Sequence, residues 1–168
     1  MTLLGHPVDF TDSKFWQEDG ENVIEHTIKN GKAMMKGEHA MSYYFTKIVN
    51  ASFNEAVAKV TAELKEAGFG ILTEIDVKET LKKKLNVDFR RYKILGACNP
   101  PFAYKALTAE NKIGTMLPCN VIVQEISDGQ VEVTAIDPLA SMQAVENPAL
   151  REIASEISKK LKTVIDVV

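Results

Sequence analysis

The sequence predicts an α+β fold, a two-layer sandwich in which about five mainly antiparallel strands carry helices on one face. Its length suits a single domain, β-rich segments alternate with helical ones, and a hairpin precedes the last helix. The 168 residues are 45% hydrophobic and 26% charged, which is enough apolar content for one buried core.

Five segments contain the β-branched and aromatic residues that are typical of strands: residues 43–49, 70–75, 91–97, 120–126 and 130–136. Only the residues SDG separate the last two segments, and such a short connection indicates a β-hairpin. A hairpin joins antiparallel neighbours, so we expect a mainly antiparallel sheet.

Capping residues mark where helices begin and end. Ser52 with Glu55 three positions later forms a capping box, and Gly68 is placed to end that helix. Asp76 predicts the start of a shorter, lysine-rich helix that ends near Leu85.

Prolines predict the start of two further helices. Pro100 and Pro101 suit a first helical turn, where a missing N–H group costs nothing. Asn147 followed by Pro148 opens the longest helix, whose apolar residues recur at helical spacing.

Residues 1–41 are expected to form an N-terminal arm, and residues 42–168 the single α+β domain. The arm carries the whole formal charge of −3, since the domain has equal numbers of acidic and basic residues. Within the arm, residues 22–35 have a helical pattern that Gly31 interrupts. The arm or a second subunit is expected to cover the sheet face that has no helices, if that face is apolar.

All three histidines, His6, His26 and His39, lie in the arm. Residues 42–168 therefore have no imidazole that acts as a general base, which excludes Ser-His-Asp and Cys-His catalysis within the domain. The slightly acidic chain predicts no nucleic acid and no anionic membrane as partner. It has no segment of about 20 apolar residues and no export signal, so we expect a cytoplasmic protein with reduced cysteines.

The strongest candidate site consists of two Cys-Asn pairs, Cys98-Asn99 and Cys119-Asn120. Cys98 lies between a strand end and a helix N-terminus, where a thiol pKa is lowered, so it is a candidate catalytic thiol with Cys119 as its resolving partner. All four residues are candidates for one ligand pocket. In the alternative interpretation both cysteines are small buried apolar residues, and the asparagines cap helices or fix loops.

No metal and no cofactor is predicted. Two thiols fall short of the four ligands of a structural zinc site. Met116 and Met142 could add soft ligands for an ion such as Cu(I), but methionine more often fills gaps in a core.

A run of basic residues offers a second candidate site, for an anionic small ligand or RNA. A solvated helix face explains the run equally simply, and the neutral domain favours this explanation. The run comprises Lys78, Lys82, Lys83, Lys84, Arg90, Arg91 and Lys93.

Four motifs, in order, resemble the bacterial and archaeal domain-of-unknown-function family 302. They are EAGFGILTEIDVKETLKKKL, YKILGACNPPFAYKAL, IGTMLPCNVIV and VTAIDP, and the resemblance extends over residues 42–168. It implies a small two-layer α+β fold of the TATA-box-binding-protein-like kind, often a homodimer. It implies neither DNA binding nor any established activity, and it does not account for the arm.

Three functions are consistent with these observations. The first is a homodimeric small-ligand-binding or accessory module with its pocket near Cys98, Asn99, Cys119 and Asn120. The alternative is a thiol-based redox enzyme or sensor that uses Cys98 with Cys119. The third is an assembly protein whose arm wraps around its partner subunit.

Overall fold

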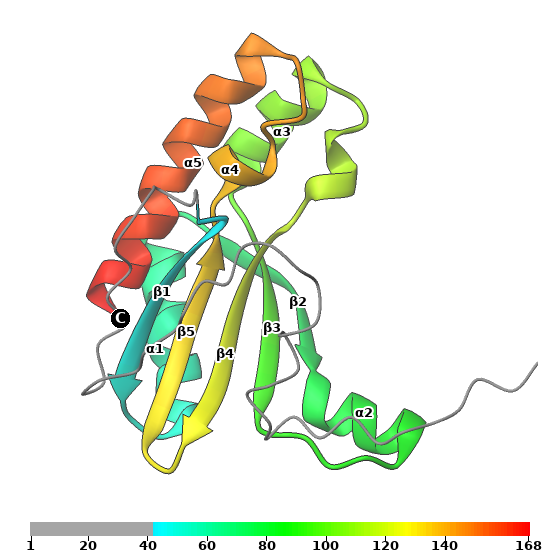
Figure 1. Ribbon diagram of the computed structural model, residues 1–168. Coiled ribbons are helices and arrows are strands. Elements are labelled where there is room, and N and C mark those ends of the chain that lie inside the picture. The colour runs from blue at the N-terminus through cyan, green and yellow to red at the C-terminus, as the bar shows by residue number, and fades with distance from the viewer. Residues whose placement is uncertain (1–41) are drawn as a thin grey trace, which may run out of the picture. The chain divides into compact units, whose positions relative to one another are not determined.

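Five antiparallel strands form one sheet in the order β1-β5-β4-β3-β2, in a computed structural model that describes residues 42–168 (Figure 1). The arm predicted over residues 1–41, with its helical pattern, lies outside the described residues. The strands are β1 (Tyr44–Asn50), β2 (Gly70–Asp76), β3 (Tyr92–Cys98), β4 (Cys119–Ser127) and β5 (Gln130–Ile136).

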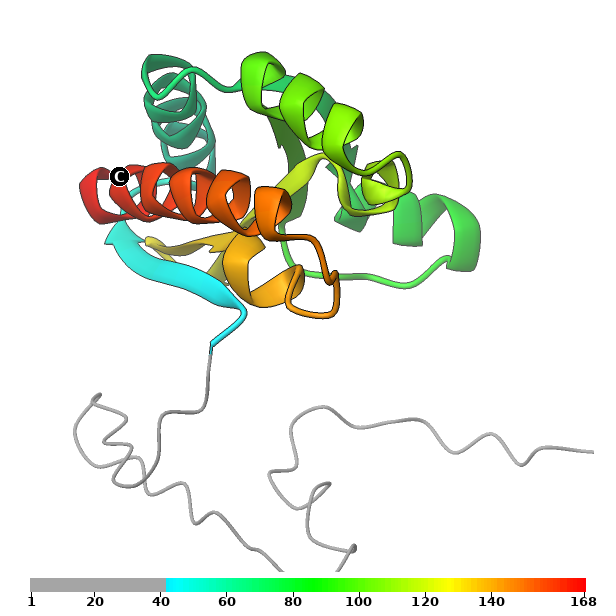
Figure 2. The ribbon, with the colours of Figure 1, turned by 90° about the horizontal axis from the view of Figure 1, so that it is seen from above.

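The two longest helices, α1 (Phe53–Glu66) and α5 (Pro148–Val167), pack side by side on one face of this sheet. Figure 2 shows both helices on the same side of the strands. The predicted two-layer α+β arrangement with helices on one face is therefore confirmed.

The shorter helices lie at the ends of the strands. Three of them pack close to the N-terminal half of α5: α3 (Pro100–Ala109), η1 (Ile113–Met116) and α4 (Pro138–Ser141). The fourth, α2 (Val77–Leu85), stands at the opposite end, beside β2 and β3, and has no buried residue (Figure 1). The sequence predicted α2 and α3 but neither η1 nor α4, because elements of one turn carry no periodic pattern.

The predicted caps are present, with one exception. Ser52 and Glu55 form the complete capping box of α1, and the side chains of Asp76 and Asn147 cap α2 and α5. Asn99 is the N-cap residue of α3, but its side chain makes no capping hydrogen bond.

The buried side chains form two hydrophobic clusters. The larger cluster lies between the sheet and helices α1 and α5, with Val60, Leu64 and Leu161 fully buried at its centre. The smaller cluster lies beneath α3 and is built around Ala106, Ile113 and Leu150. The domain therefore has a seam between these clusters, at the end of the sheet nearest α3.

The opposite face of the sheet has no helix packed on it within residues 42–168. An apolar row crosses it, because Ile75, Ile94 and Ile122 lie opposite one another on adjacent strands. Near its edges, Ile48 is 54% exposed and Tyr44 is 39% exposed.

No helix of the described residues is long and apolar enough to cross a bilayer.

Candidate functional site

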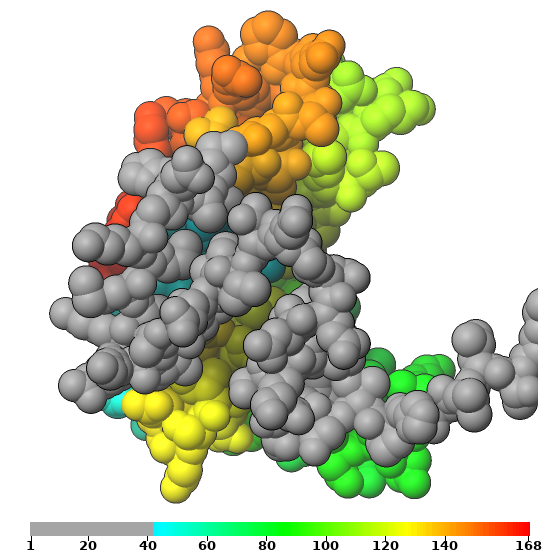
Figure 3. All heavy atoms as spheres, in the orientation of Figure 1, coloured from blue at the N-terminus to red at the C-terminus, as the bar shows by residue number. Residues whose placement is uncertain are grey.

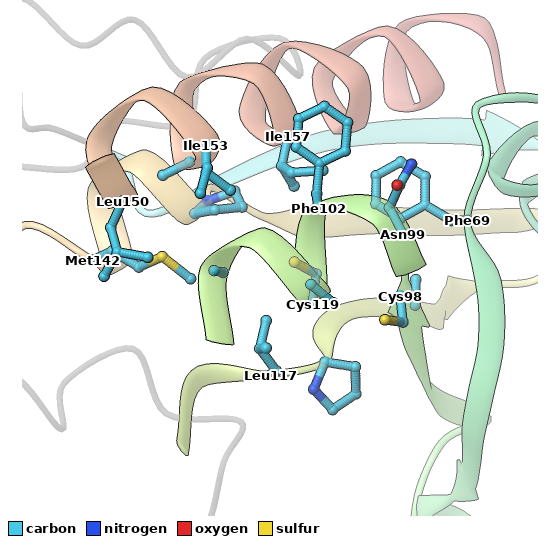
Figure 4. Close-up of a pocket in the computed structure, with 16 residues that line it drawn as sticks. Phe69, Cys98, Asn99, Phe102, Leu117, Cys119, Met142, Leu150, Ile153 and Ile157 are labelled. Carbon is cyan, nitrogen blue, oxygen red and sulfur yellow. The ribbon is translucent and has the colours of Figure 1, made fainter. Parts of the chain in front are cut away.

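A small cavity lies on the seam between the two clusters, where β3 and β4 meet the helices (Figure 4). The space open to the centre of a water molecule is about 30 Å³, which holds about two waters. Most of its lining is apolar and comes from α3, α4, α5 and the segment before β4. The larger apolar side chains are Phe69, Phe102, Leu117, Met142, Leu150, Ile153 and Ile157.

Three of the four predicted site residues line this cavity: Cys98, Asn99 and Cys119. The two cysteines lie at adjacent strand ends, since Ala97 is directly opposite Cys119 and Cys98 is the last residue of β3, and both line the cavity. In Figure 4 the Cys98 sulfur lies beside Asn99 at the start of α3, and the Cys119 sulfur is drawn further along the helix.

Asn120 does not line the cavity, so the prediction of one pocket for all four residues is wrong in this respect. Successive residues of a strand point to opposite faces, and Cys119 occupies the helix-covered face. Asn120 is exposed on the open face, where it borders a separate hollow with Tyr44 and Tyr92.

Burial raises the pKa of both thiols. The Cys119 thiol is the more buried, and desolvation together with the nearby Cys98 raises its pKa to about 11. Desolvation also raises the pKa of Cys98. The predicted lowering of the Cys98 pKa by the helix N-terminus is wrong, and Pro100 and Pro101 supply a reason: they occupy the first helical turn without N–H groups that would stabilise a thiolate.

Asn99 carries the only side-chain amide among the residues that line this cavity. Asn99 is only 8% exposed, and within residues 42–168 its side chain makes no hydrogen bond. Its backbone is nevertheless fixed, because its carbonyl oxygen accepts the Ala103 N–H at 2.9 Å. No fully buried side-chain N or O atom in the described residues lacks a partner, so both amide atoms reach open space.

Close packing beneath the cavity requires a glycine in β3. A Cβ atom added to Gly96 would lie 2.2 Å from Thr73 Oγ1 and 2.7 Å from Pro118 Cγ. Pro118 immediately precedes Cys119 and is itself part of the cavity lining. The glycine thus allows β2, β3 and the start of β4 to approach closely enough to place the two thiols.

The family model with the description "Domain of unknown function DUF302" matches residues 45–168. The chain belongs to this family. The DUF302 match confirms the resemblance seen in the four motifs. No curated protein matches the chain.

A solved structure also matches this DUF302 domain: the crystal structure of uncharacterized conserved protein DUF302 from Bacillus stearothermophilus. The two chains are 33% identical, with a TM-score of 0.69. The match covers 76% of this chain and 98% of the other chain. Both comparisons establish family and fold, and neither assigns an activity.

Sequence reasoning missed most of the apolar lining of the DUF302 cavity. Of the two methionines named as candidate soft ligands, Met142 lines the cavity, whereas Met116 is 39% exposed and does not. Residues of α4 and α5 join the site only through tertiary packing, so no local motif marks them. Within residues 42–168, no group of three or more histidine, cysteine or acidic side chains is placed to hold a metal ion.

Proposed function

We propose that this DUF302 domain binds a small, mainly apolar molecule that carries one hydrogen-bonding group. The observation that carries the proposal is the Asn99 side chain, which is 8% exposed, has no hydrogen-bond partner among residues 42–168, and keeps its amide atoms open at the edge of an otherwise apolar cavity. A ligand that hydrogen-bonds to the Asn99 amide is oriented by it and gains free energy from burying its apolar part.

The cavity must widen to admit such a ligand, and its position on the seam supports this. The lining comes from both clusters, so the cavity widens when α3 and η1 shift relative to α5, which carries Leu150 of the smaller cluster. Met142 is the most adaptable lining side chain, because methionine is unbranched and changes rotamer easily.

The proposal is tested by titrating the full chain with benzamide and with toluene, which has the same ring but no amide. Chemical shifts of backbone amides are followed by NMR. Shifts at Ala103 and Ala154 that saturate with benzamide at millimolar concentration support binding in the cavity.

Ala106→Leu fills the cavity and should abolish these shifts, because Ala106 is 3% exposed and lines it. Ala109→Leu is the matched control, since Ala109 is exposed on the same helix. Equal effects of the two substitutions, or no saturable shift in the unchanged protein, would contradict the proposal.

We further propose that two copies pair through the open sheet face. This proposal is supported by the apolar row across the face and by the exposed side chains of Ile48, Ile75 and Tyr44, because exposed apolar patches often mark interaction surfaces. Ile122→Lys places a charge at the centre of this face and should convert a dimer to a monomer in light scattering. Leu107→Lys on α3 is the control, since Leu107 is also exposed. A monomeric unchanged protein, or a dimer unaffected by Ile122→Lys, refutes this interface.

The second candidate function is thiol–disulfide exchange, favoured by the presence of Cys98 and Cys119 on one cavity. The more exposed Cys98 attacks a small disulfide such as oxidised glutathione, forming a mixed disulfide and releasing one thiol. Cys119 then attacks Cys98, forming the protein disulfide and releasing the second thiol, so the oxidant receives two electrons. Both cysteines are free thiols in the structure.

Mass spectrometry distinguishes this function from simple modification. Exchange gives a chain that has lost two hydrogens, and Cys119→Ser stops at the glutathione adduct on Cys98. Because the pKa of both thiols is raised, the rate should increase as the pH rises beyond 9. A persistent adduct in the unchanged protein would exclude Cys119 as the resolving thiol.

A further inference from the structure

A second hollow lies far from the cavity, between α2, the start of α1 and the start of β3. It measures about 560 Å³, which is within the range of small-molecule sites. Figures 1 and 3 show α2, in green, at the end of the sheet opposite to α4, in orange. Five basic side chains line the hollow: Lys78, Lys82, Lys83, Arg91 and Lys93.

Helix geometry brings the α2 lysines to one side. Successive residues turn by about 100°, so Lys78, Lys82 and Lys83 fall within an arc of about 140°. Lys84 falls on the other side of the helix and does not line the hollow. Arg91 and Lys93 are two residues apart in an extended segment and therefore point to the same face. Five of the seven residues in the basic run therefore line the hollow, and the other two do not.

Several charges in and around the hollow are already paired. Lys82 pairs with Asp88 at 3.1 Å, and Lys93 pairs with Glu74 of β2. The carboxylate of Asp76 accepts the Glu79 N–H at 2.9 Å as the cap of α2.

Three basic groups of the hollow are left: Lys78, Lys83 and Arg91 have no carboxylate partner within residues 42–168. Three carboxylates also line the hollow, those of Asp76, Glu79 and Asp88, so its five basic side chains leave a net charge of +2. The hollow therefore attracts an anion.

Arg91 is held in place before any ligand arrives. Its Nη2 donates to Asn54 Oδ1 at 2.6 Å, and its guanidinium carbon lies 4.4 Å from the centre of the Phe53 ring. Its carbonyl oxygen accepts the Glu125 N–H at 2.9 Å, which ties the backbone to β4. The remaining N–H groups of the guanidinium are available, and their fork matches two oxygens of one phosphate.

We propose that this hollow binds a small molecule bearing a diphosphate group. Arg91 donates two hydrogen bonds to one phosphate, while Lys78 and Lys83 neutralise the remaining charge from α2. The net charge of +2 on the lining side chains complements the two to three negative charges of a diphosphate. A single ion pair at an exposed surface contributes little binding free energy. The proposed site therefore depends on the fixed arginine and the two lysines acting on the same ligand.

Inorganic pyrophosphate is the probe, titrated into the full chain by calorimetry at about 20 mM salt. We expect saturable binding that Arg91→Gln weakens at least tenfold and Lys83→Gln severalfold. Lys84→Gln removes the same charge from the same helix outside the hollow and should change affinity less than twofold. Arg91→Lys keeps the charge but loses the fork, so its affinity should lie between those of Arg91→Gln and the unchanged protein.

Two results would overturn the proposal. One is equal weakening by Lys84→Gln and Lys83→Gln, which would show diffuse attraction to a charged surface. The other is a single-stranded oligonucleotide that binds more tightly than pyrophosphate and loses affinity with every lysine removed, which would assign the surface to RNA. Lys83 is exposed, so Lys83→Gln reports on binding even if Arg91→Gln lowers stability.

Discussion

The buried thiol of Cys119 should make the domain less stable at high pH. The pKa of this thiol is about 11 in the folded chain, against its usual 9.0. Above about pH 9 the unfolded thiol loses its proton while the folded thiol keeps it, so unfolding becomes more favourable. The loss grows until about pH 11, where the folded thiol also ionises. Two pKa units correspond to about 2.7 kcal/mol of unfolding free energy.

The assay is urea unfolding, under reducing conditions, of the unchanged protein and Cys119→Ala at several values between about pH 8 and pH 11. Tyrosines and lysines titrate in both proteins, so the difference between them isolates Cys119. Replacing Cys119 with alanine also leaves a small cavity, which lowers the unfolding free energy by an amount that does not depend on pH. The stability advantage of the unchanged protein should therefore shrink by about 2–3 kcal/mol across this range. A constant difference would refute the assignment of Cys119 to an apolar, water-poor cavity.

Three further substitutions test the fold that holds the cavity, each by urea unfolding. Gly96→Ala should destabilise by about 1–3 kcal/mol through overpacking, whereas Gly70→Ala, with no atom within 4 Å of the added Cβ, should not; equal losses would contradict the close approach. Ser52→Ala removes the capping box of α1 and should cost about 1 kcal/mol; an unchanged midpoint would show that the cap is dispensable. Leu161→Ala should cost about 2–5 kcal/mol because Leu161 is fully buried, and Leu72→Ala, 65% exposed, should cost little; similar costs would misplace the core.

The strands and main helices could be predicted from the sequence because their signals are local. The capping box at Ser52, the prolines that begin α3 and α5, and the short connection between β4 and β5 each act within a few residues. Their predicted boundaries lie within one or two residues of the observed ones. The antiparallel sheet follows from the hairpin and from the helices collecting on one face.

The site could be predicted only in part. The two Cys-Asn pairs drew attention to the correct strand ends, but the alternation of side chains along β4 separates Cys119 from Asn120. The effect of the helix N-terminus on Cys98 was misjudged, because burial outweighs a helix end whose first residues are prolines. The convergence of Lys83 and Arg91 depends on how α2 stands against the sheet, which no local pattern reveals.

The most direct test of the central proposal, that the cavity binds an apolar molecule through Asn99, compares the two asparagines that follow the cysteines. Asn99→Ala and Asn120→Ala remove the same group, one inside the cavity and one on the opposite face. NMR titration with benzamide and toluene should show that Asn99→Ala removes the preference for benzamide, while Asn120→Ala leaves it unchanged. A preference that survives Asn99→Ala, or that Asn120→Ala removes equally, would contradict the proposed site.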